Sequence, residues 1–276
     1  MIFQKKAGAD ITWIRTGGIV DVFEPSSVQE LELFLKGGND FVVLGFGSNV
    51  ILPDNDLDKV VLRLINLKHE LHIEDGILIV GAGVPNTICT KFCLENEYSN
   101  LEFLCTIPGT IGGAIYMNAG AYGFSTFDFV KWIEAYDFQG NLHRLYKEEI
   151  KFEYRNSNLK NLVFIRACFE LKKDQFEKIK STMQSMKMYR NSKQPRFSTF
   201  GSTFKNTTCN KAWQLIYESG CAGLRCGGAY LSDLHLNFII NDGSATSTDV
   251  VTLISKIQQK VFQTKGIWLE REVIIL

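Results

Sequence analysis

Hydrophobic and polar positions along the chain follow two periods, which predicts a mixture of strands and helices. Short apolar runs that end in glycine or polar residues predict buried strands, at residues 20–23, 41–44, 60–64, 77–80, 130–136, 162–171, 237–240 and 268–275. Polar capping residues and helical apolar stripes predict helices, at residues 27–36, 85–97, 174–186, 211–219 and 248–262. Strands and helices do not alternate strictly, so the pattern favours an α+β fold over a doubly wound parallel sheet.

Capping and turn residues define where several of these elements begin and end. Ser27 and Glu30 form a capping box, in which Ser27 is the N-cap and Glu30 reaches back to its amide. Pro85 suits the first turn of the next helix, because its missing N–H has no partner there. Residues 137–140 are typical of a hairpin turn, and the polar segment 191–203 is typical of a loop between domains.

The bulk composition bounds the class of protein. With 276 residues the chain is long for one core, which favours two or three subdomains. Lys and Arg together number 30, and so do Asp and Glu, so the net charge is zero. Nothing in that balance favours a nucleic-acid or acidic-membrane partner. It leaves an anionic small-molecule substrate open, because a binding site is built from local charge.

Cysteine usage points to a reducing compartment. Seven cysteines are present, no apolar targeting segment opens the chain, and no apolar run approaches the roughly 20 residues that span a bilayer. The histidines are scattered and no CxxC pair occurs, so buried structural thiols are favoured over a metal site. We therefore expect a cytoplasmic protein that has no membrane partner and binds no metal.

Two glycine-rich segments are the candidates for chemistry. Gly45, Phe46, Gly47, Ser48 and Asn49 follow a predicted buried strand, and such a turn can point several N–H groups at phosphate oxygens. The segment lacks the third glycine and the helix start of a dinucleotide-binding GxGxxG motif, which argues against that fold. Residues 107–123, IPGTIGGAIYMNAGAYG, are too apolar for a linker. They indicate either backbone held close to a ligand or tight turns between buried elements, and we favour the ligand.

These segments carry a resemblance to a known family. LGFGSNVILPD (44–54) resembles the pyrophosphate loop of the vanillyl-alcohol-oxidase (PCMH) type of FAD-binding domain. Residues 107–123 resemble that domain's second flavin-contacting stretch, as found in the UDP-N-acetylenolpyruvoylglucosamine reductase (MurB) family. Further motifs match in the same order, so that the resemblance spans about residues 11–275: 154–157, 201–206, 228–232, His235, 237–241 and 266–273. Thr207 and Thr106 depart from the family's usual proline and glycine, which puts local loop shape in doubt.

The resemblance implies a fold and a reaction. The fold is a two-part FAD-binding domain over residues 1–172 and a substrate domain over 173–276 whose last strand returns to the active site. The reaction is reduction of UDP-N-acetylglucosamine enolpyruvate to UDP-N-acetylmuramate with NADPH, through non-covalent FAD, for peptidoglycan synthesis. The implied FAD contacts are Gly45, Phe46, Gly47, Ser48, Asn49, Ile107, Pro108, Gly109, Thr110, Gly112, Gly113, Asn118, Gly120, Ala121 and Gly123.

Three residues are implied as catalytic, and each has an ordinary alternative. Arg155 can bind a carboxylate and stabilise an enolate, although a lone arginine is usually a surface charge. Ser202 would donate the proton, although residue types alone do not favour it over a turn serine such as Ser198. Glu272, on the predicted last strand with Glu270, would assist at the enol intermediate, whereas such acids are usually solvated.

Contacts to the substrate are expected from residues of the same motifs and from cations near the domain junction. They are Tyr154, Lys193, Lys205, Asn206, Arg190 and Arg225. The short segment between Arg190 and Gly201 resembles the smaller, type II members of the family. Two rival functions remain open: an oxidase of the same FAD-binding superfamily, and a non-catalytic flavin-binding module. We expect a monomer.

Overall fold

The computed structural model describes residues 2–67, 70–196 and 198–276, which fold into two compact units. The first unit contains residues 1–4, 22–45 and 59–190, and the second contains residues 5–21, 46–58 and 191–276. The chain therefore crosses between the units several times, and β1 (Gln4–Ala7) and β2 (Ile19–Phe23) each span a crossing. This division differs from the predicted ranges 1–172 and 173–276. Those ranges concern cofactor and substrate binding and stay a prediction.

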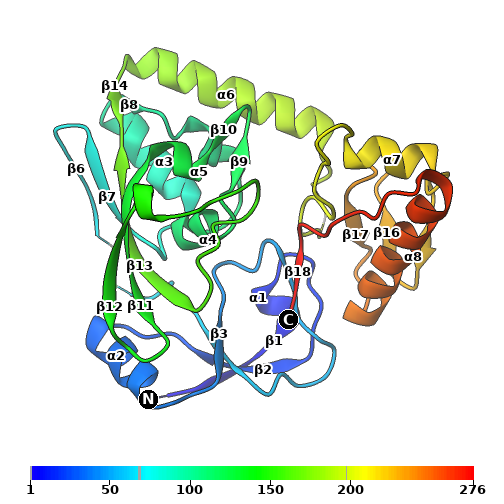
Figure 1. Ribbon diagram of the computed structural model, residues 1–276, viewed down its shortest axis with the longest axis horizontal. Helices are drawn as coiled ribbons and strands as arrows, with labels where there is room; N and C mark the ends of the chain where they lie inside the picture. The colour runs from blue at the N-terminus through cyan, green and yellow to red at the C-terminus, as the bar shows by residue number, and fades with distance from the viewer. Residues whose placement is uncertain (1, 68–69, 197) are drawn as a thin grey trace. The chain divides into compact units, whose positions relative to one another are not determined.

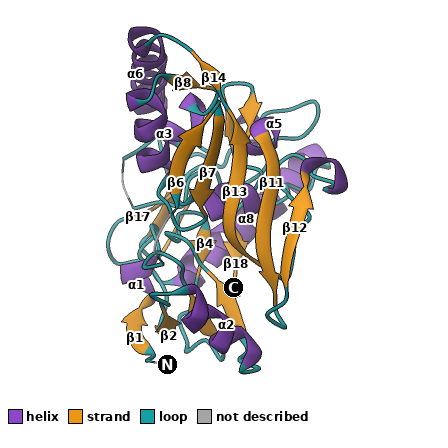
Figure 2. Cartoon of the chain, turned by 90° about the vertical axis from the view of Figure 1, so that its left-hand side faces the viewer, coloured by secondary structure: helices purple, strands orange, loops and turns teal. Residues whose placement is uncertain are grey.

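A five-stranded antiparallel sheet forms the frame of the first unit (Figure 2). Its strands, in the order β12-β11-β13-β7-β6, are β12 (Leu142–Tyr146), β11 (Val130–Asp137), β13 (Leu162–Glu170), β7 (Ile77–Gly81) and β6 (Leu71–Glu74). The predicted strands 77–80, 130–136 and 162–171 are confirmed. The turn at 137–140 is also confirmed: Gly140 has φ +83° and donates to the Asp137 carbonyl at 3.0 Å, joining β11 to β12.

One face of this sheet carries the largest apolar core. Because side chains alternate across a strand, Leu78 and Val80 of β7 and Ile133 and Ala135 of β11 point into the same core. Short helical segments cover that face: α3 (Asn86–Glu95), η1 (Glu102–Thr106), α4 (Ile111–Tyr116) and α5 (Thr126–Phe129). Pro85 stands at the N-cap of α3, one residue before the predicted first turn, and the helix ends two residues earlier than expected.

A smaller parallel arrangement completes the first unit. β5 (Val60–Leu62) pairs in parallel with β2 and with β3 (Phe41–Val43), and α2 (Val28–Lys36) packs on the same core. Ser27 caps α2 by accepting from the Glu30 amide, as predicted. The second half of the predicted capping box is wrong, because the Glu30 carboxylate accepts from the Ser26 amide at 2.8 Å and not from Ser27.

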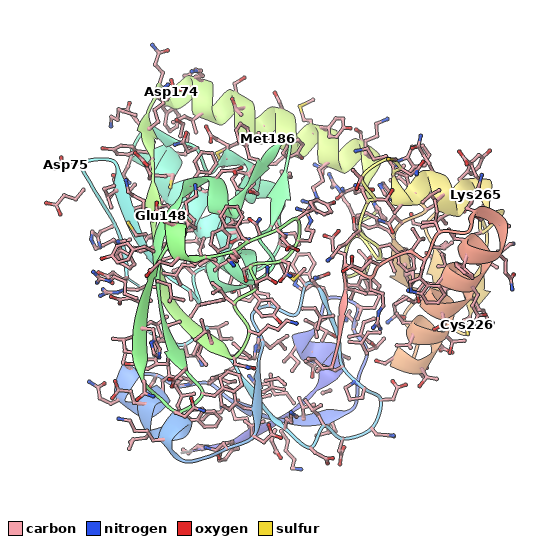
Figure 3. The ribbon with its side chains drawn as sticks, viewed as in Figure 1. Asp75, Glu148, Asp174, Met186, Cys226 and Lys265 are labelled. Atoms are coloured by element: carbon pink, nitrogen blue, oxygen red, sulfur yellow. The ribbon has the colours of Figure 1, made fainter. Side chains whose placement is uncertain are left out.

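The long helix α6 (Phe176–Lys193) leads from the first unit into the second (Figure 1). Its apolar residues were predicted to form one buried stripe, at Phe176, Ile179, Met183 and Met186. Ile179 and Met183 are buried against Cys105, whereas Phe176 is exposed. Met186, labelled in Figure 3, packs against the large core. The helix continues to Lys193, so the predicted loop at 191–203 begins within it. Short strands and one 3₁₀ turn complete the unit: β8 (Tyr98–Ser99), β9 (Gly120–Ala121), β10 (Phe124–Ser125), β14 (Lys172–Lys173) and η2 (Lys147–Glu149).

The second unit is a three-stranded antiparallel sheet packed against two helices. The strands are β15 (Arg225–Cys226), β16 (Ala229–Leu231) and β17 (Ile239–Asn241), and the helices are α7 (Ala212–Glu218) and α8 (Ser247–Lys265). Figure 3 labels Cys226 on β15 and Lys265 at the end of α8. One stripe of α8 is buried in the core, at Val250, Leu253, Ile254, Ile257 and Val261. The unit also contains α1 (Gly8–Ile11), β4 (Val50–Ile51) and β18 (Ile274–Ile275).

The predicted last strand at 268–275 is mostly wrong. Only Ile274 and Ile275 form a strand, which pairs in parallel with β4. Arg271 makes a single isolated bridge to Phe204. Glu272 therefore lies beside a single bridge and not in the predicted strand. The predicted strand at 237–240 also shifts, because its ladder starts at Ile239 and includes Asn241.

The α+β fold class is confirmed by this architecture. Within the described ranges, no helix is both long enough and apolar enough to cross a bilayer.

Candidate active site

The first glycine loop turns where only glycine fits. A Cβ on Gly45 would stand 2.7 Å from the Thr110 hydroxyl oxygen. A Cβ on Gly47 would stand 2.1 Å from the Ile11 carbonyl oxygen, and Gly47 also has φ +63°. The Gly47 carbonyl accepts from the Trp13 amide at 3.0 Å, which fixes the loop against α1. Both glycines are therefore required by close packing, and this packing shapes the turn that follows.

That turn presents backbone donors. Within the part of the chain that the structure describes, the N–H groups of Phe46, Gly47 and Asn49 donate to no protein acceptor. A run of such donors suits the oxygens of a diphosphate. The Asn49 side chain is used differently, since its Nδ2 donates to the Glu272 carbonyl at 3.0 Å. The loop residues present thus fit the diphosphate of FAD, and the same loop contacts the backbone of a predicted catalytic residue.

Arg63 supports the start of this loop, and sequence reasoning missed it. Its side chain is buried, and its Nε donates to the Gly45 carbonyl at 3.2 Å. Its Nη1 pairs with the buried Glu24 carboxylate at 3.0 Å. Burial lowers the pKa of the Arg63 guanidinium from its ordinary value, while Glu24 opposes that shift. The only sequence signal was an arginine inside an apolar strand run, which is rare without a partner.

The second glycine stretch is a turn followed by a short helix. Thr110 is the N-cap of α4 and accepts from the Gly113 amide at 3.3 Å. Gly112 packs on Ala82, to whose carbonyl it donates at 2.8 Å. The alternative of tight turns between buried elements is therefore part of the explanation. In the described chain, the N–H groups of Gly109 and Thr110 have no protein acceptor, which leaves them available to a ligand.

Asn86 ties this stretch to the start of α3. Its amide donates to the Gly109 carbonyl at 3.0 Å, and its Nδ2 donates to the Ile107 carbonyl at 3.1 Å. Its Oδ1 is buried and has no partner among the described residues. Pro108 lies between these two anchored carbonyls, so the predicted Ile-Pro-Gly contact segment is held on both sides.

The segment after α4 leads to Arg155. Asn118, a predicted flavin contact, is buried with φ +40°, and its side chain bonds the Phe127 amide and the Glu153 carbonyl. The Gly120 carbonyl accepts from Arg155 Nη2 at 2.8 Å. The structure therefore connects Arg155 directly to the predicted flavin stretch. It gives Asn118 a role in holding that loop.

Arg155 sits in a strained turn. Its backbone has φ +57°, a conformation that costs energy for any residue with a side chain. Glu153 and Asn156 close the turn with two backbone hydrogen bonds, of 2.7 and 3.2 Å. The Arg155 guanidinium lies 4.8 Å from the centroid of the half-exposed Tyr154 ring. Strain of this kind clusters at functional sites, and here it presents a cation beside the glycine stretch.

Ser202 and Glu272 lie on adjacent backbones within the second unit. The Glu272 amide donates to the Thr203 carbonyl at 2.9 Å, and the Lys205 amide donates to the Glu270 carbonyl at 2.9 Å. The two residues are thus in register one position apart, despite being 70 positions apart in the sequence. This is the one pair of predicted catalytic residues that the structure brings together within a single unit.

The predicted substrate residues have varied protein partners. Lys205 Nζ pairs with Glu270 at 2.6 Å, and Asn206 Oδ1 accepts from the Ala212 amide at 3.0 Å, capping α7. Arg190 donates to the Thr106 carbonyl and hydroxyl. Arg225 pairs with Asp242 at 3.0 Å, and Lys193 is exposed at the end of α6. Asn206 therefore has a structural partner besides its predicted contact with the substrate.

Asp54, the last residue of the LGFGSNVILPD motif, caps α8. Its carboxylate accepts from the Ser247 amide at 2.7 Å, the Thr248 amide at 2.8 Å and the Thr248 hydroxyl at 2.7 Å. Partial burial would raise the pKa of Asp54, but these hydrogen bonds outweigh it and hold the pKa below its usual value. This motif residue serves the fold.

Comparison with known proteins identifies the family of this chain. A family model described as FAD binding domain matches residues 22–146, and one described as UDP-N-acetylenolpyruvoylglucosamine reductase, C-terminal domain, matches residues 193–276. The reductase of that name from Rickettsia massiliae is 42% identical over 269 residues, which are 95% of this chain and 91% of the relative. The chain belongs to the UDP-N-acetylenolpyruvoylglucosamine reductase family.

Other relatives agree with this assignment. The reductase of the same name from Rickettsia typhi is 40% identical over the same share of both chains. The crystal structure of UDP-N-acetylenolpyruvylglucosamine reductase (MurB) from Thermus caldophilus aligns with a TM-score of 0.88 at 31% identity, covering 100% of this chain and 99% of that one. The resemblance found in the motifs is confirmed, as are the FAD cofactor and the class of NADPH-dependent flavin oxidoreductase.

Proposed function

We propose that this protein uses Arg155, Ser202 and Glu272 to reduce the enolpyruvyl ether of UDP-N-acetylglucosamine enolpyruvate to the lactyl ether of UDP-N-acetylmuramate. The observation that carries the proposal is that one chain matches both the cofactor-domain model and the reductase C-terminal model of its family. Bound FAD would transfer the electrons of NADPH to the substrate as a hydride. The product is a precursor for peptidoglycan.

Each residue has a task that follows from charge balance. A hydride added to the vinyl methylene carbon leaves negative charge on the adjacent carbon and its carboxylate. The guanidinium of Arg155 stays charged and can bind that carboxylate through two hydrogen bonds. The Ser202 hydroxyl would then deliver the proton to the carbon that bore the charge. Glu272, whose amide is tied to Thr203 beside Ser202, would stabilise the enol form next to the donor.

The charged groups around these residues support the assignment. Lys205 is mostly buried, carries a positive charge and lies three positions from Ser202 in the sequence. A cation that faced the serine would make proton donation easier, because it would stabilise the alkoxide that remains. Its partner Glu270 is well exposed, so this pair is easily rearranged when an anionic substrate arrives.

An anaerobic spectral titration tests the proposal. The purified protein would show flavin absorption bands that bleach when NADPH is added and return when the UDP-enolpyruvyl sugar is added. Bands that bleach but return only with air would favour an oxidase. A protein with no flavin, and none restored by added FAD, would contradict the reading of the glycine loops.

We further propose that the protein acts in the cytoplasm as a monomer. The described cysteines are all unpaired, and most are buried, which is consistent with a reducing compartment. Size-exclusion chromatography with light scattering would give the mass in solution. A mass of twice 31.2 kDa would contradict the monomer.

A further inference from the structure

Residues 202–205 run between two other backbone segments that lie far away in the sequence. On one side, Ser202 forms an isolated bridge to Phe238, and the Thr203 amide donates to the Asn237 carbonyl at 2.8 Å. On the other side, Phe204 forms a bridge to Arg271. None of these contacts belongs to a continuous strand, so ordinary ladder pairing does not account for the position of the segment.

Asn237 supplies the pairing that a strand would have given. Its Oδ1 accepts from the Phe204 amide at 3.0 Å, and its Nδ2 donates to the Phe204 carbonyl at 2.8 Å. The side-chain amide therefore takes the place of a peptide group. Both residues are almost completely buried, with exposed fractions of 4% for Asn237 and 1% for Phe204. Removing either bond would leave a buried backbone group of Phe204 without a partner, which is costly.

We infer that Asn237 is a positioning residue for the protonation half of the reaction. This inference rests on the proposed roles of Ser202 and Glu272. Asn237 bonds the backbones of Thr203 and Phe204, Thr203 follows Ser202 directly, and the Thr203 carbonyl accepts from the Glu272 amide. The buried Asn237 side chain thus holds Phe204, two positions after the proton donor, while the Asn237 main-chain carbonyl holds Thr203, whose own carbonyl accepts from the Glu272 amide.

His235 supports the backbone of Asn237. The Asn237 amide donates to His235 Nδ1 at 3.3 Å, and the His235 ring lies 4.7 Å from the centroid of the Phe238 ring. Burial lowers the pKa of His235, which favours the neutral ring that this acceptor role requires. The backbone of Asn237 is therefore fixed by a hydrogen bond of its own, as the support of a functional residue requires.

A matched control exists in the same strand region. Asn241 is likewise buried, with an exposed fraction of 5%, and its side-chain amide is fully used. Its Oδ1 accepts from the Gly243 and Ala245 amides at 2.7 and 3.0 Å, and its Nδ2 donates to the Ile14 carbonyl at 2.8 Å. It bonds neither the 202–205 segment nor Glu272. Substitution of Asn241 therefore reports the cost of losing a buried asparagine amide without touching the proposed site.

The test separates the two half-reactions in an anaerobic stopped-flow instrument. The variants are Asn237→Asp, Asn237→Ala and the control Asn241→Asp, each measured as the FAD-bound enzyme. Flavin bleaching by NADPH is followed first, and reoxidation by the UDP-enolpyruvyl sugar second. For both Asn237 variants at neutral pH we expect reoxidation to slow by about 100-fold, since a misplacement of about 1 Å at a reacting group costs that much. We expect bleaching to change by less than about threefold, and the control to change neither step by more than that.

The aspartate variant gives a second readout. A protonated carboxyl has one O–H donor and one acceptor, as the amide does, so it can restore both bonds to Phe204. Burial raises the pKa of such an acid. The reoxidation rate of each variant is divided by the wild-type rate at the same pH. This ratio should rise as the pH falls for Asn237→Asp and should stay constant for Asn237→Ala.

The possible outcomes distinguish failure of the inference about Asn237 from failure of the proposed function. Loss of FAD, or equal slowing of both half-reactions, in the two Asn237 variants would show a purely structural role and overturn the inference. Unchanged reoxidation would overturn it as well. A wild-type enzyme that NADPH bleaches but the UDP-sugar does not reoxidise would instead refute the proposed function, before any variant is considered.

Discussion

Substitution of Gly47 by alanine tests whether the first glycine loop holds the FAD diphosphate. At φ +63° an added side chain costs about 1–2 kcal/mol. The new Cβ would also stand 2.1 Å from the Ile11 carbonyl oxygen, where contacts under 3.0 Å force a shift, so the loop must move by about 1 Å. A shift of that size misaligns the free N–H groups of Phe46, Gly47 and Asn49. Losing one charge-assisted hydrogen bond costs about 1.5–3 kcal/mol, which is about 10-fold to 150-fold in Kd.

Gly38→Ala is the matched control for this substitution. Gly38 has φ +68°, so the backbone penalty is the same, but nothing lies within 4 Å of its added Cβ. The Kd for FAD would be measured by quenching of flavin fluorescence on apoprotein, and stability by urea denaturation of the same samples. We expect both variants to lose stability and only Gly47→Ala to lose affinity for FAD. Equal Kd values for the two variants would refute the reasoning, because the loop would then not be the diphosphate site.

Three further variants test the remaining assignments. Ser202→Ala should keep flavin bleaching by NADPH and slow reoxidation by the UDP-sugar by about 10²–10⁴-fold, the usual contribution of a positioned proton donor, and a retained steady-state turnover would contradict it. Arg155→Lys keeps the charge but loses the paired donors, so reoxidation should slow by about 10²-fold and the KM for the UDP-sugar should rise, both measured in the same anaerobic assay. Asp54→Asn should lose about 1–2 kcal/mol of unfolding free energy at pH 7 in urea titrations. Because the pKa of Asp54 is lowered on folding, the wild-type advantage is present above the unfolded value of 3.8 and should disappear as the pH falls through the folded value; an advantage that persisted in acid would contradict the cap.

The sequence pattern predicted those helices and strands whose formation depends mainly on their own residues. Three strands of the large sheet, β7, β11 and β13, were predicted to within a few residues, as were helices such as α2 and α7, because period and capping act over one element at a time. The edge strands β6 and β12 of that sheet were not predicted. The helix α4 was not predicted, because two of the six residues of this helix are glycine. That helix exists because Thr110 caps it and because Ile111 and Ile115 are buried in the core of the sheet, and burial outweighs propensity.

The errors lie where pairing is non-local. Residues 268–275 have the apolar composition of a strand, but a strand needs a partner, and only Ile274 and Ile275 find one in β4. The polar residues after Arg190 read as a loop, yet lysine, serine and asparagine tolerate the end of a helix once its beginning is anchored by buried Ile179 and Met183. Arg63 and Asn237 could not be identified from sequence, because their partners are 18 and 33 positions away.

The second unit places its candidate catalytic residues on irregular backbone held by asparagine amides. Asn237 pairs with Phe204, and Asn49 donates to the Glu272 carbonyl. Each amide joins segments that no continuous strand joins, so it can set the position of one residue without imposing the alternation of a ladder. This explains why the strand predicted through Glu272 was wrong. It also gives Asn49 two tasks, because its backbone N–H is available to a diphosphate while its side chain holds the backbone of Glu272. The loop that we assign to FAD and the carboxylate that we assign to catalysis are therefore parts of one hydrogen-bonded structure.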